Sequence, residues 1–162
     1  MGKKSLLLCW LIGLSFVIVL AACSGGNTTD NGTRTKGPII ITTDHATYTT
    51  TAPIKFSVIN QTKSAIYAFD TQSNCTILEL EIQMNGQWEP SDDVACQTGK
   101  LPVRITIAPG QTYTGTISVS ASKGKSAALP PGTYRLALFY SNSTTPFSQL
   151  IRLTSETLSV TN

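Results

Sequence analysis

The sequence has few of the side chains on which catalysis depends. Its 162 residues include one histidine, His45, and only 13% of them are charged. His45 lies in the polar stretch TTDHATY, which is typical of a surface turn, and no GxSxG motif marks an activated serine. The residue types of a Ser–His–Asp triad are present, but no local pattern brings them together. We therefore expect a protein that is not an enzyme and that uses no cofactor.

Acidic residues are also scarce, with nine Asp and Glu in the whole chain. Glu89, Asp92 and Asp93 lie close together, but they lack the later Gly and Glu of an EF-hand loop. Neighbouring carboxylates on one loop do not face each other across a sugar ring, as a glycosidase requires. We interpret them as a solvated acidic loop and expect no metal site.

Basic residues do not dominate either. The net charge is +3, and Lys3 and Lys4 supply two of the twelve positive side chains. Without this N-terminal pair, ten positive and nine negative side chains remain, a net charge of +1. So small an excess gives no field that would attract a polyanion, and we expect no nucleic-acid partner.

Long apolar runs are absent except for one, which follows Lys3 and Lys4. Residues 6–20 form an apolar core of about 15 positions, which suits a secretory signal and is shorter than the roughly 20 residues of a membrane span. Residues 20–23 then read LAAC. In this context LAAC resembles the bacterial lipobox.

The lipobox resemblance implies a lipid anchor. Cys23 would receive a diacylglyceryl group, and cleavage would remove residues 1–22 as the signal peptide. The alternative is an uncleaved N-terminal anchor helix with an incidental cysteine. Both readings place the rest of the chain on the extracytoplasmic face of the cell membrane, because Lys3 and Lys4 stay inside.

The residues after the anchor divide into a linker and one domain. Residues 24–36, SGGNTTDNGTRTK, contain no bulky apolar side chain, so we predict that residues 23–36 are the lipidated cysteine and a disordered linker. Residues 37–162 number about 125, which is enough for one domain with its own hydrophobic core.

Cysteine is rare, and none of the four occurs in a CxxC motif. Cys9 leaves with the signal peptide and Cys23 is the lipidation site. Cys75 and Cys96 remain as an even pair in an oxidising compartment, so we predict a disulfide between them. The alternative, a two-cysteine metal or redox site, would have only His45 as an imidazole ligand.

From residue 37 onward, apolar residues recur with a period of two, which is typical of half-buried strands. The alternation runs through IKFSVIN (54–60), ILELEIQM (77–84), VRITI (103–107), YTGTISV (113–119) and TYRLALFY (133–140), and QLIRLT and TLSV close the chain. Asn85-Gly86 favours a type I′ hairpin turn between ILELEIQM and QWEP. About seven to nine short strands predict an antiparallel β-sandwich.

Three segments resemble a known family. YTTTAPIKFSVINQTKSAIYAF, IAPGQTYTGTISV and LPPGTYRLALFY are similar to bacterial immunoglobulin-like domains of surface lipoproteins, including a set named for an intracellular proteinase inhibitor from bacilli. The resemblance covers residues 37–161 and implies an all-β, antiparallel immunoglobulin-like sandwich in an extracellular module. It carries over no catalytic residue. Trp88 lies between Cys75 and Cys96, so we do not expect their bond to cross the sheets as in antibodies.

These observations predict a binding or scaffolding module of the bacterial envelope. A protein–protein interaction is our first hypothesis, and the unidentified partner is an envelope protein or a glycan. One alternative is a protease inhibitor that acts through residues 89–101, a long loop of the kind that carries function on rigid scaffolds. The other is a glycan-binding module, in which Trp88 forms a stacking platform with Tyr48 and Tyr67. The candidate binding residues are Trp88, Glu89, Asp92, Asp93 and Lys100.

Overall fold

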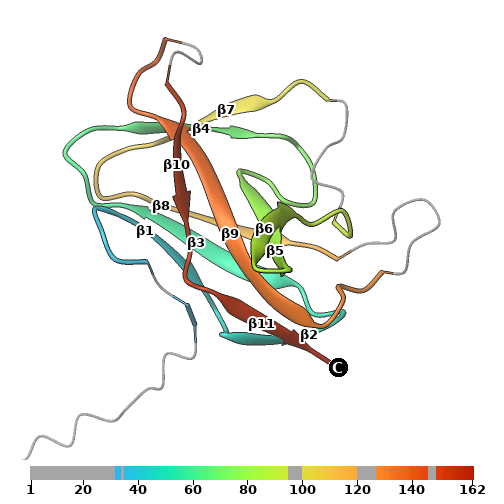
Figure 1. Cartoon of the computed structure of the whole chain (residues 1–162). Helices are drawn as coiled ribbons and strands as arrows, with labels where there is room; N and C mark the ends of the chain where they lie inside the picture. The colour runs from blue at the N-terminus through green and yellow to red at the C-terminus, as the bar shows by residue number, and fades with distance from the viewer. Residues whose placement is uncertain (1–31, 34, 95–99, 120–126, 146–148) are drawn as a thin grey trace, which may run out of the picture.

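The computed structural model describes residues 32–33, 35–94, 100–119, 127–145 and 149–162. These residues form eleven strands and no helix, which confirms the all-β prediction (Figure 1). The strands are β1 (Ile39–Thr43), β2 (Thr47–Thr49), β3 (Ile54–Asn60), β4 (Ile66–Asp70), β5 (Leu78–Met84), β6 (Gln87–Pro90), β7 (Val103–Ile107), β8 (Thr112–Ile117), β9 (Gly132–Ser141), β10 (Ile151–Thr154) and β11 (Leu158–Thr161).

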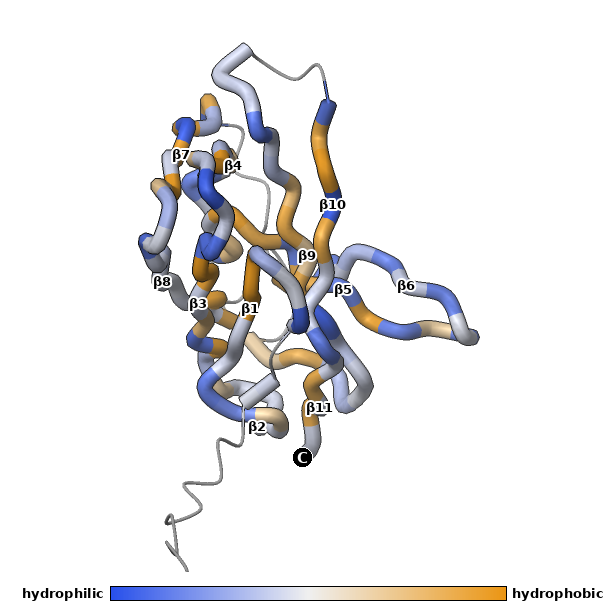
Figure 2. Tube along the Cα trace, turned by 90° about the vertical axis from the view of Figure 1, so that its left-hand side faces the viewer, coloured by the Kyte–Doolittle hydropathy of each residue, from blue (hydrophilic) through white to orange (hydrophobic). Residues whose placement is uncertain are grey.

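The described strands make two sheets that face each other as in a β-sandwich. The smaller sheet has the order β1-β3-β8, and the larger has the path β2-β11-β9-β4-β7, to which β5, β6 and β10 add. All pairings are antiparallel except the parallel pair β2–β11. Figure 2 shows β1, β3 and β8 on one side and β9 and β10 on the other, with the β5–β6 hairpin projecting outward.

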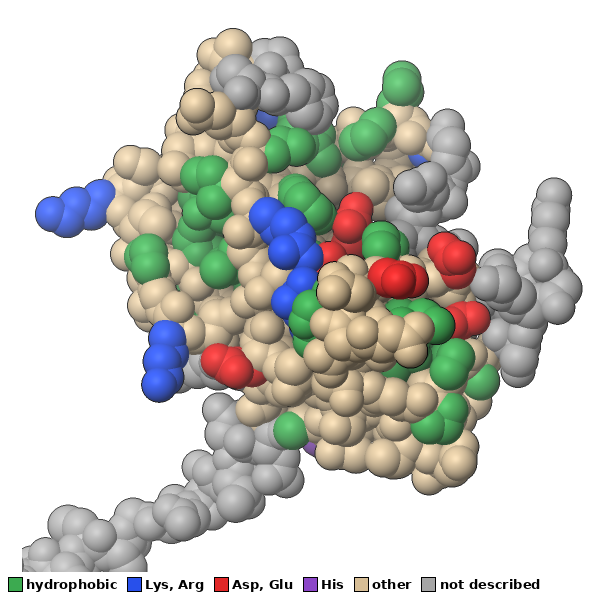
Figure 3. All heavy atoms as spheres, viewed as in Figure 1, with side chains coloured by type: hydrophobic (Ala, Val, Ile, Leu, Met, Phe, Trp, Pro, Cys, Tyr) green, Lys and Arg blue, Asp and Glu red, His purple; other side chains and the backbone are tan. Residues whose placement is uncertain are grey.

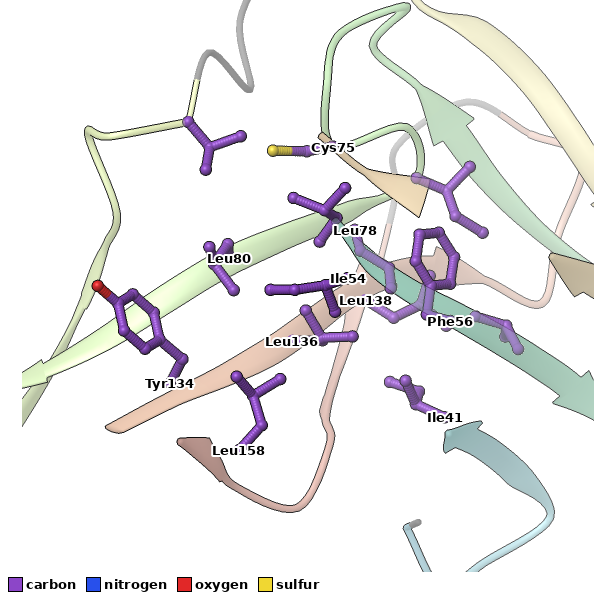
Figure 4. Close-up of a cluster of buried hydrophobic side chains, with 14 of the residues drawn as sticks. Ile41, Ile54, Phe56, Cys75, Leu78, Leu80, Tyr134, Leu136, Leu138 and Leu158 are labelled. Carbon is purple, nitrogen blue, oxygen red and sulfur yellow. The ribbon is translucent and has the colours of Figure 1, made fainter. Parts of the chain in front are cut away.

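The core lies between the two sheets. Side chains from alternate positions of β3, β5 and β9 converge there, as the period of two predicts (Figure 4). Tyr134 lies at one end of this cluster and is fully buried, and its hydroxyl donates a hydrogen bond to the Pro130 carbonyl at 2.7 Å. The labelled members of the cluster are Ile41, Ile54, Phe56, Cys75, Leu78, Leu80, Tyr134, Leu136, Leu138 and Leu158.

The hairpin turn was predicted correctly, but the strand count was wrong. Asn85 and Gly86 have φ angles of 51° and 79°, as the type I′ turn between β5 and β6 requires. The described residues hold eleven strands rather than seven to nine. The strands that the alternation did not predict are β1, β2 and β4. Each is only three to five residues long, so the pattern has little room to repeat.

The start of the domain also differs from the expectation of a disordered linker through residue 36. Thr33 and Thr35 are both buried and are hydrogen-bonded to β1. The Thr43 amide donates to the Thr33 carbonyl at 3.1 Å, and the Thr35 amide donates to the Ile41 carbonyl at 3.1 Å. The domain therefore begins at least four residues before residue 37. The predicted signal peptide and Cys23 lie outside the described residues.

Candidate functional site

The outer face of the larger sheet carries an unusual mixture of aromatic and charged side chains. These residues occupy the positions on β4, β5 and β9 that alternate with the core residues, so they point away from the smaller sheet. In an antiparallel sandwich this face is normally polar and solvated. Here it bears Tyr67, Phe69, Glu79, Glu81, Arg135 and Phe139.

A groove of about 610 Å³ lies on this face, across β4, β5 and β9, and we call it the outer-face groove. Phe69 and Phe139 line it from neighbouring strands. Leu150, which is 47% exposed, also lines it. Two acidic residues, Glu79 and Asp92, also belong to the lining. The groove thus combines apolar walls with negative charge.

A buried ionic cluster lies beside the outer-face groove. Glu81 is only 5% exposed, and its Oε2 accepts a hydrogen bond from Arg135 Nε at 2.7 Å. Its Oε1 accepts from Arg152 Nη2. The Arg135 guanidinium also stacks on Trp88 at 4.2 Å from the ring centroid, and that of Arg152 lies 5.9 Å from the ring centroid of Phe139. Figure 3 shows basic side chains on this face with acidic ones gathered next to them.

The pKa values of Glu81 and Glu79 shift in opposite directions although the two residues lie on the same face of β5. Burial tends to raise the pKa of Glu81, but hydrogen bonds from Arg152 and Arg135 outweigh burial and lower it. Burial and the negative charge of Glu81 raise the pKa of Glu79, and Arg152 offsets this only in part. Among the described side chains, none forms an ion pair with Glu79. Both arginines are already bound to Glu81.

The groove wall also holds a hydroxyl group that has no partner. Ser91 is 5% exposed, and its amide donates to the Leu80 carbonyl at 2.8 Å, which places it directly after β6. Its Oγ is buried and has no hydrogen-bond partner among the described residues. A buried polar group without a partner costs free energy, and such groups are rare in native proteins.

The structure places the five predicted binding residues in different surroundings. Asp92 lines the outer-face groove. Trp88 lies on the same face but is half-buried against Arg135, while Glu89 pairs with Ile82 and so points to the opposite side of the β5–β6 hairpin. The other two are Asp93, which is half-buried, and Lys100, which is exposed. Burial raises the pKa of Tyr134 to about 12, and the negative charge of Asp93 adds to this.

The predicted loop and disulfide fall only partly within the described residues. Residues 95–99 of the 89–101 loop, including Cys96, lie outside them. Cys75 is fully buried, and Val94 belongs to the same core cluster. Because Val94 is two residues before Cys96, this placement fits the expected pairing, which stays a prediction.

The predicted stacking platform is wrong, because Tyr48 belongs to the core. Tyr48 is 4% exposed, and its hydroxyl donates to Asp44 Oδ1 at 2.6 Å. Burial and this hydrogen bond raise the pKa of Tyr48 to about 12. Tyr67 lies on the outer face under Arg104, whose guanidinium is 5.7 Å from the ring centroid. The prediction of a surface histidine is confirmed, since 60% of the His45 side chain is exposed.

Sequence reasoning missed the residues that build this face. The alternation grouped Glu81 with solvent-exposed residues, yet it is buried because two arginines from distant strands converge on it. One signal was available for the groove. Phe139 falls on the polar face of TYRLALFY, and a large aromatic residue at an outward position indicates an interaction surface.

Comparison with known proteins adds no identity to this geometry. No protein-family model and no curated protein sequence matches the chain. Within the described ranges, no three His, Cys, Asp or Glu side chains are placed to hold a metal ion. The part of the chain that the structure describes also contains no helix long and apolar enough to cross a membrane.

Proposed function

We propose that this chain is a lipid-anchored binding module of the bacterial envelope and that it binds a protein partner in the outer-face groove. The observation that carries this proposal is the presence of Phe69, Phe139 and Leu150 on a sheet face that would otherwise be polar. Exposed apolar surface with a polar border is typical of protein-interaction sites.

The anchor part of the proposal rests on the LAAC motif and on the docked start of the domain. Cys23 lies ten residues before Thr33, which is hydrogen-bonded to β1. Ten residues span at most about 35 Å when fully extended. A lipid on Cys23 would therefore hold the domain close to the membrane, and the expected partner is an envelope protein within that distance.

The proposed fold within the β-sandwich is immunoglobulin-like. The hydrogen bond from the Tyr134 hydroxyl to the Pro130 carbonyl supports this assignment. Tyr134 lies near the start of a central strand and reaches back four residues, which resembles the tyrosine corner of immunoglobulin domains. The departure is the pair of cysteines, which flank the β5–β6 hairpin in the sequence.

Two alternatives remain as outcomes of the test. Glycan binding would use Phe69 and Phe139 as stacking surfaces and Glu79 and Asp92 as hydrogen-bond acceptors. These residues would replace the predicted platform around Trp88. Protease inhibition would use residues 89–101. The groove favours a protein partner because its apolar walls meet on one concave surface, whereas sugar binding needs an exposed flat ring.

Site-specific crosslinking in cells tests the proposal. A photo-crosslinking amino acid replaces Phe139 in the full chain, and the control replaces Thr116, which is exposed on the smaller sheet. We expect one reproducible envelope protein from position 139 and not from position 116. Cell-wall glycan without protein at position 139 supports the glycan alternative, and no product at either position rejects the groove as a binding site.

Fatty-acid labelling tests the anchor separately. In cells given an alkyne fatty acid, the full chain should carry the label and Cys23→Ala should not, while the mass of Cys23→Ala should show that it keeps residues 1–22. Label that is unchanged by Cys23→Ala would reject lipidation at this cysteine.

A further inference from the structure

We propose that the outer-face groove recognises a basic peptide segment, in which a Lys or Arg side chain pairs with Glu79 and a neighbouring aliphatic side chain lies between Phe69 and Phe139. This inference rests on the proposed function and adds the chemistry of the partner. It follows from two features of the groove: its charge and its walls.

The groove carries negative charge, and one of its two carboxylates, Glu79, forms no ion pair within the described structure. Glu79 and Asp92 belong to the lining, and no described side chain forms an ion pair with Glu79. Arg135 and Arg152, which lie beside the groove, are hydrogen-bonded to Glu81. Complementary potentials fix which partners bind, so a cationic group is the complement of this surface and an acidic group is repelled.

The walls of the groove are apolar and belong to three different strands or loops. Phe69 comes from β4, Phe139 from β9, and Leu150 from the residue before β10. A volume of about 610 Å³ accepts several side chains rather than one. The partner that fits both the walls and the charge is therefore a peptide segment in which basic and aliphatic residues lie next to each other or alternate.

Peptide selection against the full-length lipidated chain in nanodiscs tests the inference. The probe is a phage-displayed library of random linear heptapeptides. We expect the enriched peptides to carry Lys or Arg beside an aliphatic residue, with basic residues at least threefold above their frequency in the unselected library. A synthetic copy of the top peptide should lose at least tenfold in affinity on Glu79→Gln.

Glu156→Gln is the matched control, because Glu156 is an exposed carboxylate between β10 and β11 that does not line the groove. It should bind the peptide as the unchanged chain does. Because burial and the charge of Glu81 raise the pKa of Glu79, neutralising Glu79 is not expected to destabilise the fold. A thermal melt of Glu79→Gln checks this, and Glu79→Asp, which keeps the charge, should retain part of the affinity.

Five outcomes would overturn the inference. Enrichment of acidic or uncharged peptides contradicts the charge argument, and affinity that is unchanged in Glu79→Gln contradicts the assigned contact. No enrichment, while position 139 still crosslinks to an envelope protein, rejects a linear basic segment but leaves the proposed function standing. Loss of both crosslinking and enrichment rejects the groove altogether, and self-crosslinking at position 139 assigns it to a second copy of the chain.

Discussion

Glu81 lies directly opposite Arg135 in the pairing of β5 with β9, and the two side chains are joined at 2.7 Å on the outer face of the larger sheet. Arg152 reaches the other oxygen of the same carboxylate from β10, and Trp88 covers the Arg135 guanidinium from β6. Four strands are thus connected through one buried carboxylate. This cluster connects the strands of the larger sheet beside the outer-face groove.

Replacing Glu81 with Gln should reduce the free energy of unfolding by about 2 kcal/mol. The change keeps the shape of the side chain but leaves two arginine side chains without their anion, and breaking a buried pair is strongly destabilising. We place the value below the range for fully buried pairs because 40% of the Arg152 side chain is exposed. Urea denaturation of the exported chain measures it, with Glu156→Gln as the control. A loss below about 0.5 kcal/mol would show that the cluster is not structural.

The contribution of Glu81 should also depend on pH. Its pKa in the folded state is lowered from 4.5, so the folded state favours the ionised form more than the unfolded state does. The stabilisation is therefore fully present above the unfolded-state pKa and is lost as pH falls through the folded-state pKa. The difference in unfolding free energy between the unchanged chain and Glu81→Gln should be constant above pH about 6 and shrink below pH about 4. A difference that stays constant down to pH 3 contradicts this.

The sequence predicted the inner face of the sheets better than the outer face, for a physical reason. A period of two identifies residues that share a face, and burial between sheets then selects the apolar set, as in β3. It does not identify which distant strand lies alongside. Arg135 and Arg152 are 54 and 71 residues from Glu81, so no local pattern could show that they meet. The groove depends on the same long-range pairing of β4, β5 and β9.

Asn60 should be the most sensitive polar residue in the core. It is fully buried at the end of β3, and its Nδ2 donates to the carbonyls of Ser64 and Ile107 at 2.9 and 2.8 Å. Its Oδ1 accepts from the amide and hydroxyl of Thr62. Asn60→Ala removes these bonds and leaves the buried Ile107 carbonyl and the Thr62 amide without their side-chain partner, which should cost about 3 kcal/mol. Asn142→Ala, at an exposed asparagine that also heads an Asn-x-Thr triplet, should change the unfolding free energy by less than about 0.5 kcal/mol.

The predicted bond between Cys75 and Cys96 can be tested by mass and by stability. The two positions are 21 residues apart, and a crosslink of that span should contribute about 3 kcal/mol. Peptide mapping of the exported, unreduced chain should recover one peptide pair that contains both cysteines. Cys96→Ser should lower the free energy of unfolding by that amount, and reduction should then have no further effect. Two free thiols in the denatured, unreduced chain would contradict the prediction.

Gly115 should be intolerant of any side chain because Phe56 occupies the space beside it. The two residues are directly opposite in the pairing of β3 with β8, and a Cβ at position 115 would lie 2.4 Å from Phe56 Cζ. Phe56 is 3% exposed and stacks with Tyr113 on the same strand as Gly115, so its ring has little room to move. Gly115→Ala should therefore reduce the free energy of unfolding by about 2 kcal/mol, as overpacking of cores does.

A double-mutant cycle separates this clash from a general intolerance of the strand. Phe56→Leu alone leaves a smaller side chain in the core and should cost about 1 to 2 kcal/mol. In the double variant the alanine methyl enters the space that the ring has vacated, so the double change should cost at least about 1 kcal/mol less than the sum of the single changes. Additive costs would show that the ring moves aside and that the glycine is required for another reason. A favourable coupling would show that Gly115 is present because Phe56 lies over the backbone of β8.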